Sequence, residues 1–169
     1  MIEVAISPEE GWSGATDWQA LADRAVNTAL RHSPHAALVD MAVLVEISVR
    51  FTDDAEVQAL NASYRGKDRP TNVLSFPMVE PDLLPTLADS DDGEILLGDI
   101  VLAAGVCLRE AADKGVPMET HATHLIVHGT LHLLGYDHID EAEGDAMESV
   151  ERTALAAIGI DDPYAIEDD

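Results

Sequence analysis

The segment from Met118 to Leu134 constrains the fold most, because its residue pattern predicts one long helix with a clear start and a clear end. Gly115-Val116-Pro117 interrupts the helical pattern that precedes it, and proline is favoured where a helix begins. Gly135 supplies the left-handed turn that ends the helix and lets the chain fold back. We expect this helix to be central, with the functional side chains at its C-terminal end.

Shorter periodic segments predict the elements that surround this helix. Strands are expected at residues 2–6, 41–51, 73–76 and 95–102, and further helices after a Thr16-Asp17-Trp18-Gln19 capping box, after Thr52-Asp53-Asp54, over residues 103–114 and after Asp140. Since strands and helices do not alternate strictly, the predicted fold class is α+β, a single domain with a mixed sheet of about four strands packed with about five helices. The pattern leaves the strand order open.

Each amphipathic helix should bury its apolar face. The predicted buried residues are Trp18, Leu21, Ala22, Ala25 and Ala29 on the first helix, Val57, Leu60 and Tyr64 on the second, and Met147, Val150, Ala154 and Ile158 on the last. Gly66 and Gly159 are the expected ends of the second and the last helix.

Length and composition indicate one compact domain. The chain has 169 residues, of which 47% are hydrophobic, so we expect one core and one domain, residues 1–169, with an acidic tail from about residue 160. No apolar run approaches the roughly 18 residues of a membrane span and no secretion signal is evident, which predicts a soluble, cytoplasmic protein with no membrane partner. Cys107 is the only cysteine. An intrachain disulfide and a thiolate cage are therefore excluded, and any metal must be held by nitrogen and oxygen.

The charge balance argues against indiscriminate binding of nucleic acid. Nine basic and 33 acidic residues give a net charge of −24, which repels polyphosphate at long range. The acids are unevenly spread, with six in residues 77–94 and twelve in residues 137–169. Arg65, Lys67 and Arg69 make one locally cationic stretch, and such a patch can coexist with an acidic whole.

The histidines carry the strongest chemical signal. His128 and His132 are four residues apart, so on a helix both side chains can reach one ion. The turn at Gly135 allows His138 to complete a set of three imidazoles, and three imidazoles with an open fourth position suit one catalytic Zn²⁺ per chain. The predicted zinc site thus lies at the end of the central helix. His124 and His121 lie one and two turns before His128, where roles behind the ligands or on the surface are expected.

Two other functions are compatible with this histidine spacing. Metzincin peptidases share it, but their motif begins His-Glu, and here Gly129 replaces the glutamate that acts as general base. Met147 fits the apolar face of the last helix better than it fits a Met-turn. A non-catalytic assembly factor would instead use zinc structurally, with Asp137 or Asp140 as a fourth ligand.

A second informative segment, LNASYRGKDRPTNVLSFP at residues 60–77, joins a helix end to a strand through a basic loop. An arginine that points into a metal cleft would offer a planar set of donors to a phosphate. Arg65 is the candidate for this role.

Three segments together resemble the YbeY family of bacterial rRNA maturation endoribonucleases. They are LNxxYRxKDxPTxVLSFP at residues 60–77, Leu97-Gly98-Asp99-Ile100, and HGxLHLxGYDH at residues 128–138. The chain departs from the family pattern at Asn72, where many members have aspartate, and in the long acidic loop after Pro77.

The resemblance implies a zinc-dependent, single-strand-specific endoribonuclease that trims the 3′ end of 16S rRNA and takes part in ribosome quality control. By matching position, the implied zinc ligands are His128, His132 and His138, with Arg65 as the catalytic or phosphate-binding arginine. Lys67 and Arg69 are candidates for substrate binding, and Asp99 and His124 for orienting a ligand histidine. The implied partners are rRNA, the small ribosomal subunit and assembly factors, and no DNA is expected.

A mechanism follows as a hypothesis. Zinc would polarise a phosphate oxygen or deliver hydroxide to phosphorus, while Arg65 neutralises the charge that develops. Whether water or the RNA 2′-hydroxyl attacks stays open. The acidic remainder would suppress random RNA binding and leave targeting to ribosomal proteins or assembly factors.

Overall fold

The computed structural model describes residues 2–9, 11–40, 43–84, 94–136 and 140–163. In this part of the chain, a four-stranded sheet has the order β1-β2-β4-β3, in which β1 pairs with β2 and β2 with β4 in parallel, and β3 with β4 antiparallel. The strands are β1 (Ile2–Pro8), β2 (Leu44–Thr52), β3 (Val73–Pro77) and β4 (Glu94–Ala103). The α-helices are α1 (Trp18–Arg31), α2 (Asp54–Arg65), α4 (Ala104–Lys114), α5 (Met118–Leu133) and α6 (Glu141–Ala157). Two short 3-10 helices, η1 (Ala36–Asp40) and η2 (Pro81–Leu83), complete the described elements.

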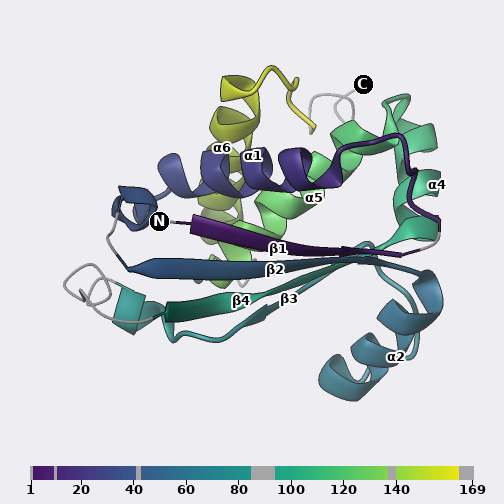
Figure 1. Cartoon of the computed structure of the whole chain (residues 1–169), viewed down its shortest axis with the longest axis horizontal. Coiled ribbons are helices and arrows are strands. Elements are labelled where there is room, and N and C mark those ends of the chain that lie inside the picture. The colour runs from purple at the N-terminus through teal and green to yellow at the C-terminus, as the bar shows by residue number, and fades with distance from the viewer. Residues whose placement is uncertain (1, 10, 41–42, 85–93, 137–139, 164–169) are drawn as a thin grey trace.

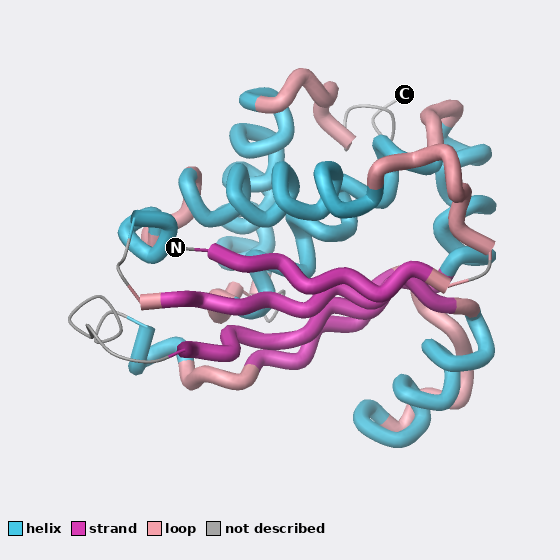
Figure 2. Tube along the Cα trace, viewed as in Figure 1, coloured by secondary structure: helices cyan, strands magenta, loops and turns pink. Residues whose placement is uncertain are grey.

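The α-helices cover the two faces of the sheet unequally. α1, α5 and α6 lie over one face, whereas α2 lies on the opposite side near one end of the strands (Figures 1 and 2). The main core fills the space between the sheet and α1, α5 and α6. A small second cluster of Val57, Leu74, Val101 and Ala103 lies beneath α2. The single-domain α+β prediction with a mixed sheet is therefore confirmed.

The helix starts follow local capping chemistry, with one correction. Asp53 and Asp140 cap α2 and α6 by accepting hydrogen bonds from the backbone N–H groups of Glu56 and Glu143, at 2.8 and 2.7 Å, as predicted. The predicted capping box at Thr16 is wrong, because the Asp17 carboxylate caps α1 through the N–H of Ala20 at 3.0 Å. Thr16 turns away and donates to Glu119 at 2.8 Å.

The predicted apolar faces are largely the buried ones. Every residue proposed for the first helix face is buried in α1. On α2, Val57 is buried and Leu60 is half-buried, but Tyr64 is 71% exposed, and its ring meets the Phe76 ring at an interplanar angle of 63°. On α6, Met147 and Ala154 are fully buried. The expected strand 41–51 begins later than predicted, at Leu44, and its first two residues, 41 and 42, lie outside the described part of the chain.

Two glycines allow α5 to approach the sheet closely. A Cβ atom on Gly98 of β4 would lie 2.6 Å from both the Leu133 Cδ2 atom and the Phe76 carbonyl oxygen. A Cβ on Gly129 of α5 would lie 3.0 Å from Ile100 Cγ2. Side chains at these positions would push α5 away from β4, so both glycines set the short distance between the helix and the sheet. α5 is thus the central helix, in contact with α1, α4, α6, β3 and β4. Among the described helices, none combines the length and apolar character needed to cross a bilayer.

Candidate metal centre and adjoining cleft

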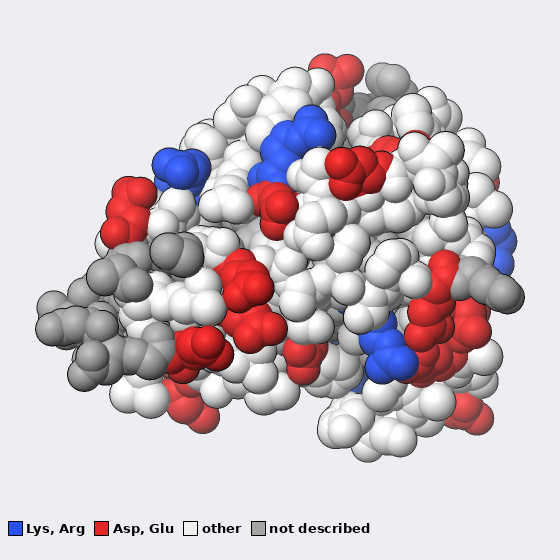
Figure 3. All heavy atoms as spheres, in the orientation of Figure 1, with Lys and Arg blue, Asp and Glu red and all other residues white. Residues whose placement is uncertain are grey.

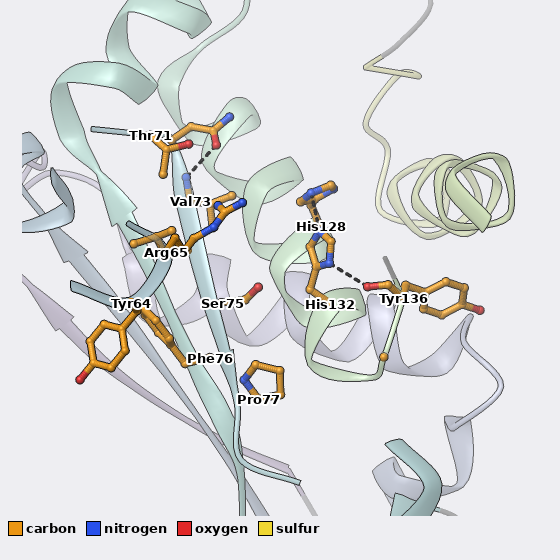
Figure 4. Close-up of a pocket in the computed structure, with 13 residues that line it drawn as sticks. Tyr64, Arg65, Thr71, Val73, Ser75, Phe76, Pro77, His128, His132 and Tyr136 are labelled. Carbon is orange, nitrogen blue, oxygen red and sulfur yellow. Dashed lines mark hydrogen bonds between the residues drawn. The ribbon is translucent and has the colours of Figure 1, made fainter. Parts of the chain in front are cut away.

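A cleft of about 870 Å³ lies between the sheet edge and the C-terminal end of α5 (Figure 4). β3 is the terminal strand of the sheet, so its side forms one wall, and α5 forms the other. The lining residues are Tyr64, Arg65, Thr71, Asn72, Val73, Leu74, Ser75, Phe76, Pro77, His128, His132, Gly135 and Tyr136. The cleft therefore joins the two segments that the sequence marks as functional.

His128 and His132 converge on this cleft from the same side of α5. Their Nε2 atoms lie 3.0 Å apart. Each Nδ1 atom faces an acceptor at 2.8 Å, which is Glu151 Oε1 for His128 and the Tyr136 carbonyl for His132. Each Nδ1 therefore carries the proton, and the Nε2 atoms present lone pairs. Two lone pairs that face each other at this distance repel each other unless a cation lies between them. The two imidazoles are therefore suited to bind a metal ion.

The turn after α5 explains why Tyr136 reaches His132. Gly135 has a φ of +101°, its N–H donates to the His132 carbonyl at 3.0 Å, and the Tyr136 N–H donates to the Leu131 carbonyl at 3.1 Å. These two bonds form a Schellman motif, which glycine permits because it has no Cβ. The predicted left-handed turn at Gly135 is confirmed. It also places the carbonyl that orients the His132 ring.

Glu151 of α6 is the carboxylate behind the histidines. Its side chain is 0% exposed and accepts hydrogen bonds from His124 Nε2 and His128 Nδ1, both at 2.8 Å. Burial would raise the pKa of Glu151, but the bonds from His124 and His128 outweigh it and hold the pKa far below its usual range. Burial lowers the pKa of His124, so this histidine donates as a neutral ring. The result is a buried negative charge next to His128.

The residue pattern of the last helix contains a signal for Glu151, which is not among the predicted site residues. Met147, Glu151 and Ala154 share the spacing of one helix face, and all three are buried. A glutamate on a predicted apolar stripe needs a buried partner, since an unpaired buried charge is costly. His124 and His128 are those partners.

Two placements of a metal ion are compatible with these side chains. His124, His128 and Glu151 each offer a ligand atom within 4.8 Å of the others, so this group could hold an ion. An ion there would replace both hydrogen bonds to Glu151 and would be enclosed. The Nε2 atoms of His128 and His132 instead meet at the cleft, at a separation near the ~3.3 Å expected for two nitrogens of a tetrahedral zinc site. This second placement leaves an open position for substrate.

The other predicted site residues fall into distinct places. Arg65 is exposed on the opposite wall and extends toward the histidines (Figure 4). Lys67 and Arg69 line a neighbouring cavity that shares Arg65 with the cleft. Asp99 faces away from α5, because its neighbour Ile100 contacts Gly129 and successive strand residues point to opposite faces.

Some candidates cannot be placed or have other partners. His138, the expected third ligand, and Asp137 lie outside the described residues. Asp140 caps α6 through the Glu143 N–H. His121 is buried and contacts Glu110 at 2.8 Å, away from the histidine pair. Thus neither His121 nor His124 is a surface residue.

Gly129 tests the peptidase alternative directly. In a metzincin-like arrangement, its position would carry the general base. Here that position faces Ile100, and a Cβ would already lie 3.0 Å from its Cγ2 atom. A side chain at residue 129 would therefore enter the core and not the cleft, which disfavours peptide hydrolysis.

An anchored pair of metal-competent imidazoles that faces an arginine across an open cleft is compatible with a hydrolase that uses a metal ion. Comparison with known proteins gives the particular kind. The family model described as Endoribonuclease YbeY matches residues 9–159. The chain is 65% identical over 169 residues to Endoribonuclease YbeY of Rhizorhabdus wittichii, with 100% of both chains covered. It is 58% identical over 168 residues to the protein of the same name from Sphingopyxis alaskensis, with 99% of this chain and 100% of the relative covered.

The fold also has a solved counterpart. A Thermotoga maritima protein, determined in solution, superposes with a TM-score of 0.54 at 21% identity and covers 99% of this chain and 97% of its own. This likeness supports the fold alone. The family model and the relatives establish that the chain belongs to the endoribonuclease YbeY family.

Proposed function

We propose that this protein is a zinc-dependent, single-strand-specific endoribonuclease that matures the 3′ end of 16S rRNA and contributes to ribosome quality control. The observation that carries the proposal is the histidine pair, with Nε2 atoms 3.0 Å apart, facing Arg65 across one cleft in a member of the endoribonuclease YbeY family. Family membership does not favour the peptidase or the non-catalytic alternative. The packing of Gly129 against Ile100 is a further argument against the peptidase.

The proposed zinc ligands are His128, His132 and His138, with one ion per chain. Nitrogen ligands suit zinc, and the buried negative charge of Glu151 makes the His128 imidazole a more basic metal ligand. When bound, zinc would supply Lewis acidity at the scissile phosphate. Glu151 and the Tyr136 carbonyl would keep the two rings of the described pair in the tautomer that ligation requires.

Arg65 is the proposed phosphate-binding and catalytic residue. Its guanidinium is exposed on the wall opposite the histidines, so it can contact a phosphate held between the two walls. Charge that builds on the phosphate oxygens in the transition state would be stabilised by its donors. Lys67 and Arg69 would bind phosphates further along the strand.

Single-stranded RNA fits the walls of the cleft better than a duplex does. Tyr64 is one of the lining residues and is 71% exposed, so its ring would offer an aromatic surface to an unpaired base next to the cleft. Bases in a duplex are stacked on each other and cannot use such a surface.

The acidic surface bears on the proposed partners. Acidic side chains are spread over the face shown in Figure 3, and the whole chain carries −24 charges. This charge would weaken binding to arbitrary RNA and to DNA. We propose that contacts with the small ribosomal subunit and its assembly factors bring the enzyme to its substrate in the cytoplasm.

The deciding experiment measures cleavage and zinc content together. The substrates are a single-stranded RNA copying the 3′ region of 16S rRNA, the same RNA as a duplex, and single-stranded DNA of the same sequence. The proteins are wild type, His132→Ala and Arg65→Ala, with His35→Ala and Arg24→Ala as controls for loss of a histidine or an arginine outside the cleft. We expect both cleft variants to lose RNA cleavage, only His132→Ala to lose zinc, and both controls to behave as wild type.

Two results would redirect the conclusion. If the wild type retains zinc but leaves RNA intact even with small subunits present, the assembly-factor alternative replaces the nuclease. If the wild type digests an unstructured protein and Arg65→Ala does so equally well, the peptidase alternative gains support.

A further inference from the structure

A second cavity of about 450 Å³ adjoins the histidine cleft. The two share Arg65, Thr71 and Asn72, so a strand that leaves the cleft past Arg65 enters this cavity next. Its volume lies in the range of small-ligand pockets, which suits one nucleotide unit.

Three cationic side chains line the second cavity. Arg65, Lys67 and Arg69 are all exposed, and in the described part of the chain no carboxylate lies within ion-pair distance of any of them. The loop that carries them is held in place, because Asn61 Nδ2 donates to the Arg69 carbonyl at 2.9 Å. Asp68, the acid within the loop, is bonded to Gln58 at 3.0 Å. These three side chains therefore have donors available for a phosphate.

A carboxylate, Glu110 of α4, also lines this cavity. Its Oε1 atom accepts hydrogen bonds from His121 Nε2 at 2.8 Å and from Asn72 Nδ2 at 3.0 Å. The His121 hydrogen bond, followed by the Asn72 hydrogen bond, outweighs partial burial and lowers the pKa of Glu110, so the group is ionised at neutral pH. The side chain is 37% exposed, and no described residue donates to its Oε2 atom. One oxygen is thus fixed and the other can accept a hydrogen bond from a ligand.

The three cations favour an anionic group such as phosphate, whereas the Glu110 carboxylate repels phosphate and accepts hydrogen bonds. A ligand that satisfies both must carry an anionic group and a hydrogen-bond donor. A ribonucleotide has this pair of groups on adjacent atoms, the 3′-phosphate and the 2′-hydroxyl, and DNA lacks the hydroxyl. We propose that the second cavity binds a ribonucleotide next to the cleaved one. Arg65, Lys67 and Arg69 hold its phosphates, and Glu110 accepts a hydrogen bond from its 2′-hydroxyl. Glu110 is then a specificity residue that distinguishes RNA from DNA, and Asn72 and His121 position it.

This proposal rests on RNA being the substrate, as proposed above. The test uses a short single-stranded RNA and a set of copies, each with one 2′-deoxy nucleotide at a different position. Binding is measured by fluorescence anisotropy in the His132→Ala background, where the RNA stays intact, and kcat/KM is measured with the otherwise wild-type enzyme. The second protein carries Glu110→Gln, which preserves an acceptor for His121 and Asn72. Asp113→Asn removes the same charge from an exposed position of α4 and is the matched control.

We expect one position at which the 2′-deoxy substitution weakens binding and kcat/KM about tenfold, as loss of a hydrogen bond to a charged group does. Glu110→Gln should reduce this penalty to less than about threefold, and Asp113→Asn should leave it unchanged. Equal affinity of the His132→Ala protein for every copy, with equal kcat/KM of the wild type for every copy, overturns the proposal. A full penalty in Glu110→Gln overturns it as well. A penalty that follows removal of a base amino group, and not the 2′-hydroxyl, overturns the ribose assignment.

The RNA substitutions probe the site even if Glu110→Gln is unstable. A wild-type enzyme that cleaves RNA without sensing any 2′-hydroxyl outside the scissile nucleotide refutes this inference and leaves the nuclease standing. A wild-type enzyme that neither binds nor cleaves RNA refutes both.

Discussion

The two walls of the cleft are built in opposite ways. On the α5 wall, His128 and His132 are each oriented through Nδ1, and the carboxylate behind His128 is completely buried. On the α2–β3 wall, Arg65 is exposed and its side chain has no ion-pair partner among the described residues. Hydrogen bonds thus fix the histidine side chains of the α5 wall, whereas the Arg65 side chain of the other wall is available to bind a ligand.

The difference matches what each wall has to bind. A metal ion requires ligands at fixed distances, so rings locked by hydrogen bonds raise affinity and select the tautomer. A phosphate strand approaches from solvent and needs donors that are not already satisfied by carboxylates. Arg65 on this wall, and Lys67 and Arg69 in the adjoining cavity, have no ion-pair partner among the described residues, although the chain has a net charge of −24.

The largest expected effect is the loss of activity when the exposed Arg65 side chain is removed. Arg65→Ala is expected to lower kcat about 10²- to 10³-fold, because a donor to the developing charge is lost from the cleft. Zinc content and melting temperature should match those of wild type. A loss of zinc in this variant would contradict the separation of roles between the walls, and Arg24→Ala is the control.

The next largest expected effect is on zinc binding and stability, and it comes from removing Glu151 behind the α5 wall. Glu151→Ala should weaken zinc binding about 10- to 100-fold and cost about 3 kcal/mol of unfolding free energy, since two histidines lose a buried partner. Metal competition and urea denaturation of the metal-free protein measure the two effects separately. Glu148→Ala, one turn earlier on α6, is the control. Unchanged zinc affinity in Glu151→Ala would mean that the carboxylate does not orient His128.

A smaller change tests the packing that sets the depth of α5. Gly129→Ala should destabilise the protein by about 1 kcal/mol, because the new methyl group would lie 3.0 Å from Ile100 Cγ2 and overpacking outweighs the gain in helix propensity. Urea denaturation measures the difference. Stabilisation by this substitution would show that Ile100 can move away and that the contact is not tight.

In the cavity that adjoins the cleft, Lys67→Ala and Arg69→Ala should lower the affinity for RNA and leave kcat unchanged. Each should reduce the slope of log affinity against log salt by about 0.7, the value for one phosphate contact on a single strand. RNA binding from low to moderate salt measures the slope. If the slope does not change, these side chains do not contact phosphate.

The smallest effect concerns pH. Because the pKa of Glu110 is lowered in the folded protein, its ionised form stabilises the fold above its unfolded pKa near 4.5, and this contribution is lost as pH falls through the folded pKa. The stability advantage of wild type over Glu110→Gln should therefore be full at pH 6 and shrink below about pH 4.5. We expect less than about 1 kcal/mol, since the group is partly exposed and screened. Urea denaturation at several pH values measures it, and a difference that grows on acidification would contradict the assignment.

The sequence predicted those parts of the site that depend on neighbouring residues. The i, i+4 spacing placed His128 and His132 on one side of a helix, and Gly135 marked its end, because both follow from helix geometry alone. Tyr64 shows the limit of this reasoning. Its spacing fits an apolar face, but α2 lies over only one end of the sheet, and the Tyr64 side chain is 71% exposed.

By itself, then, the sequence determined the elements, the histidine pair and the family resemblance. Only the tertiary structure decided which side chains contact the two histidines and which side chains line the adjoining cavity. Glu151 is 23 residues from His128 in the chain, and Asn72 and Glu110 are 38 residues apart. Their contacts depend on how α6 and α4 pack and on β3 being the outermost strand next to β4. Local periodicity carries no information about such pairings, because they are selected by burial and shape across the whole core.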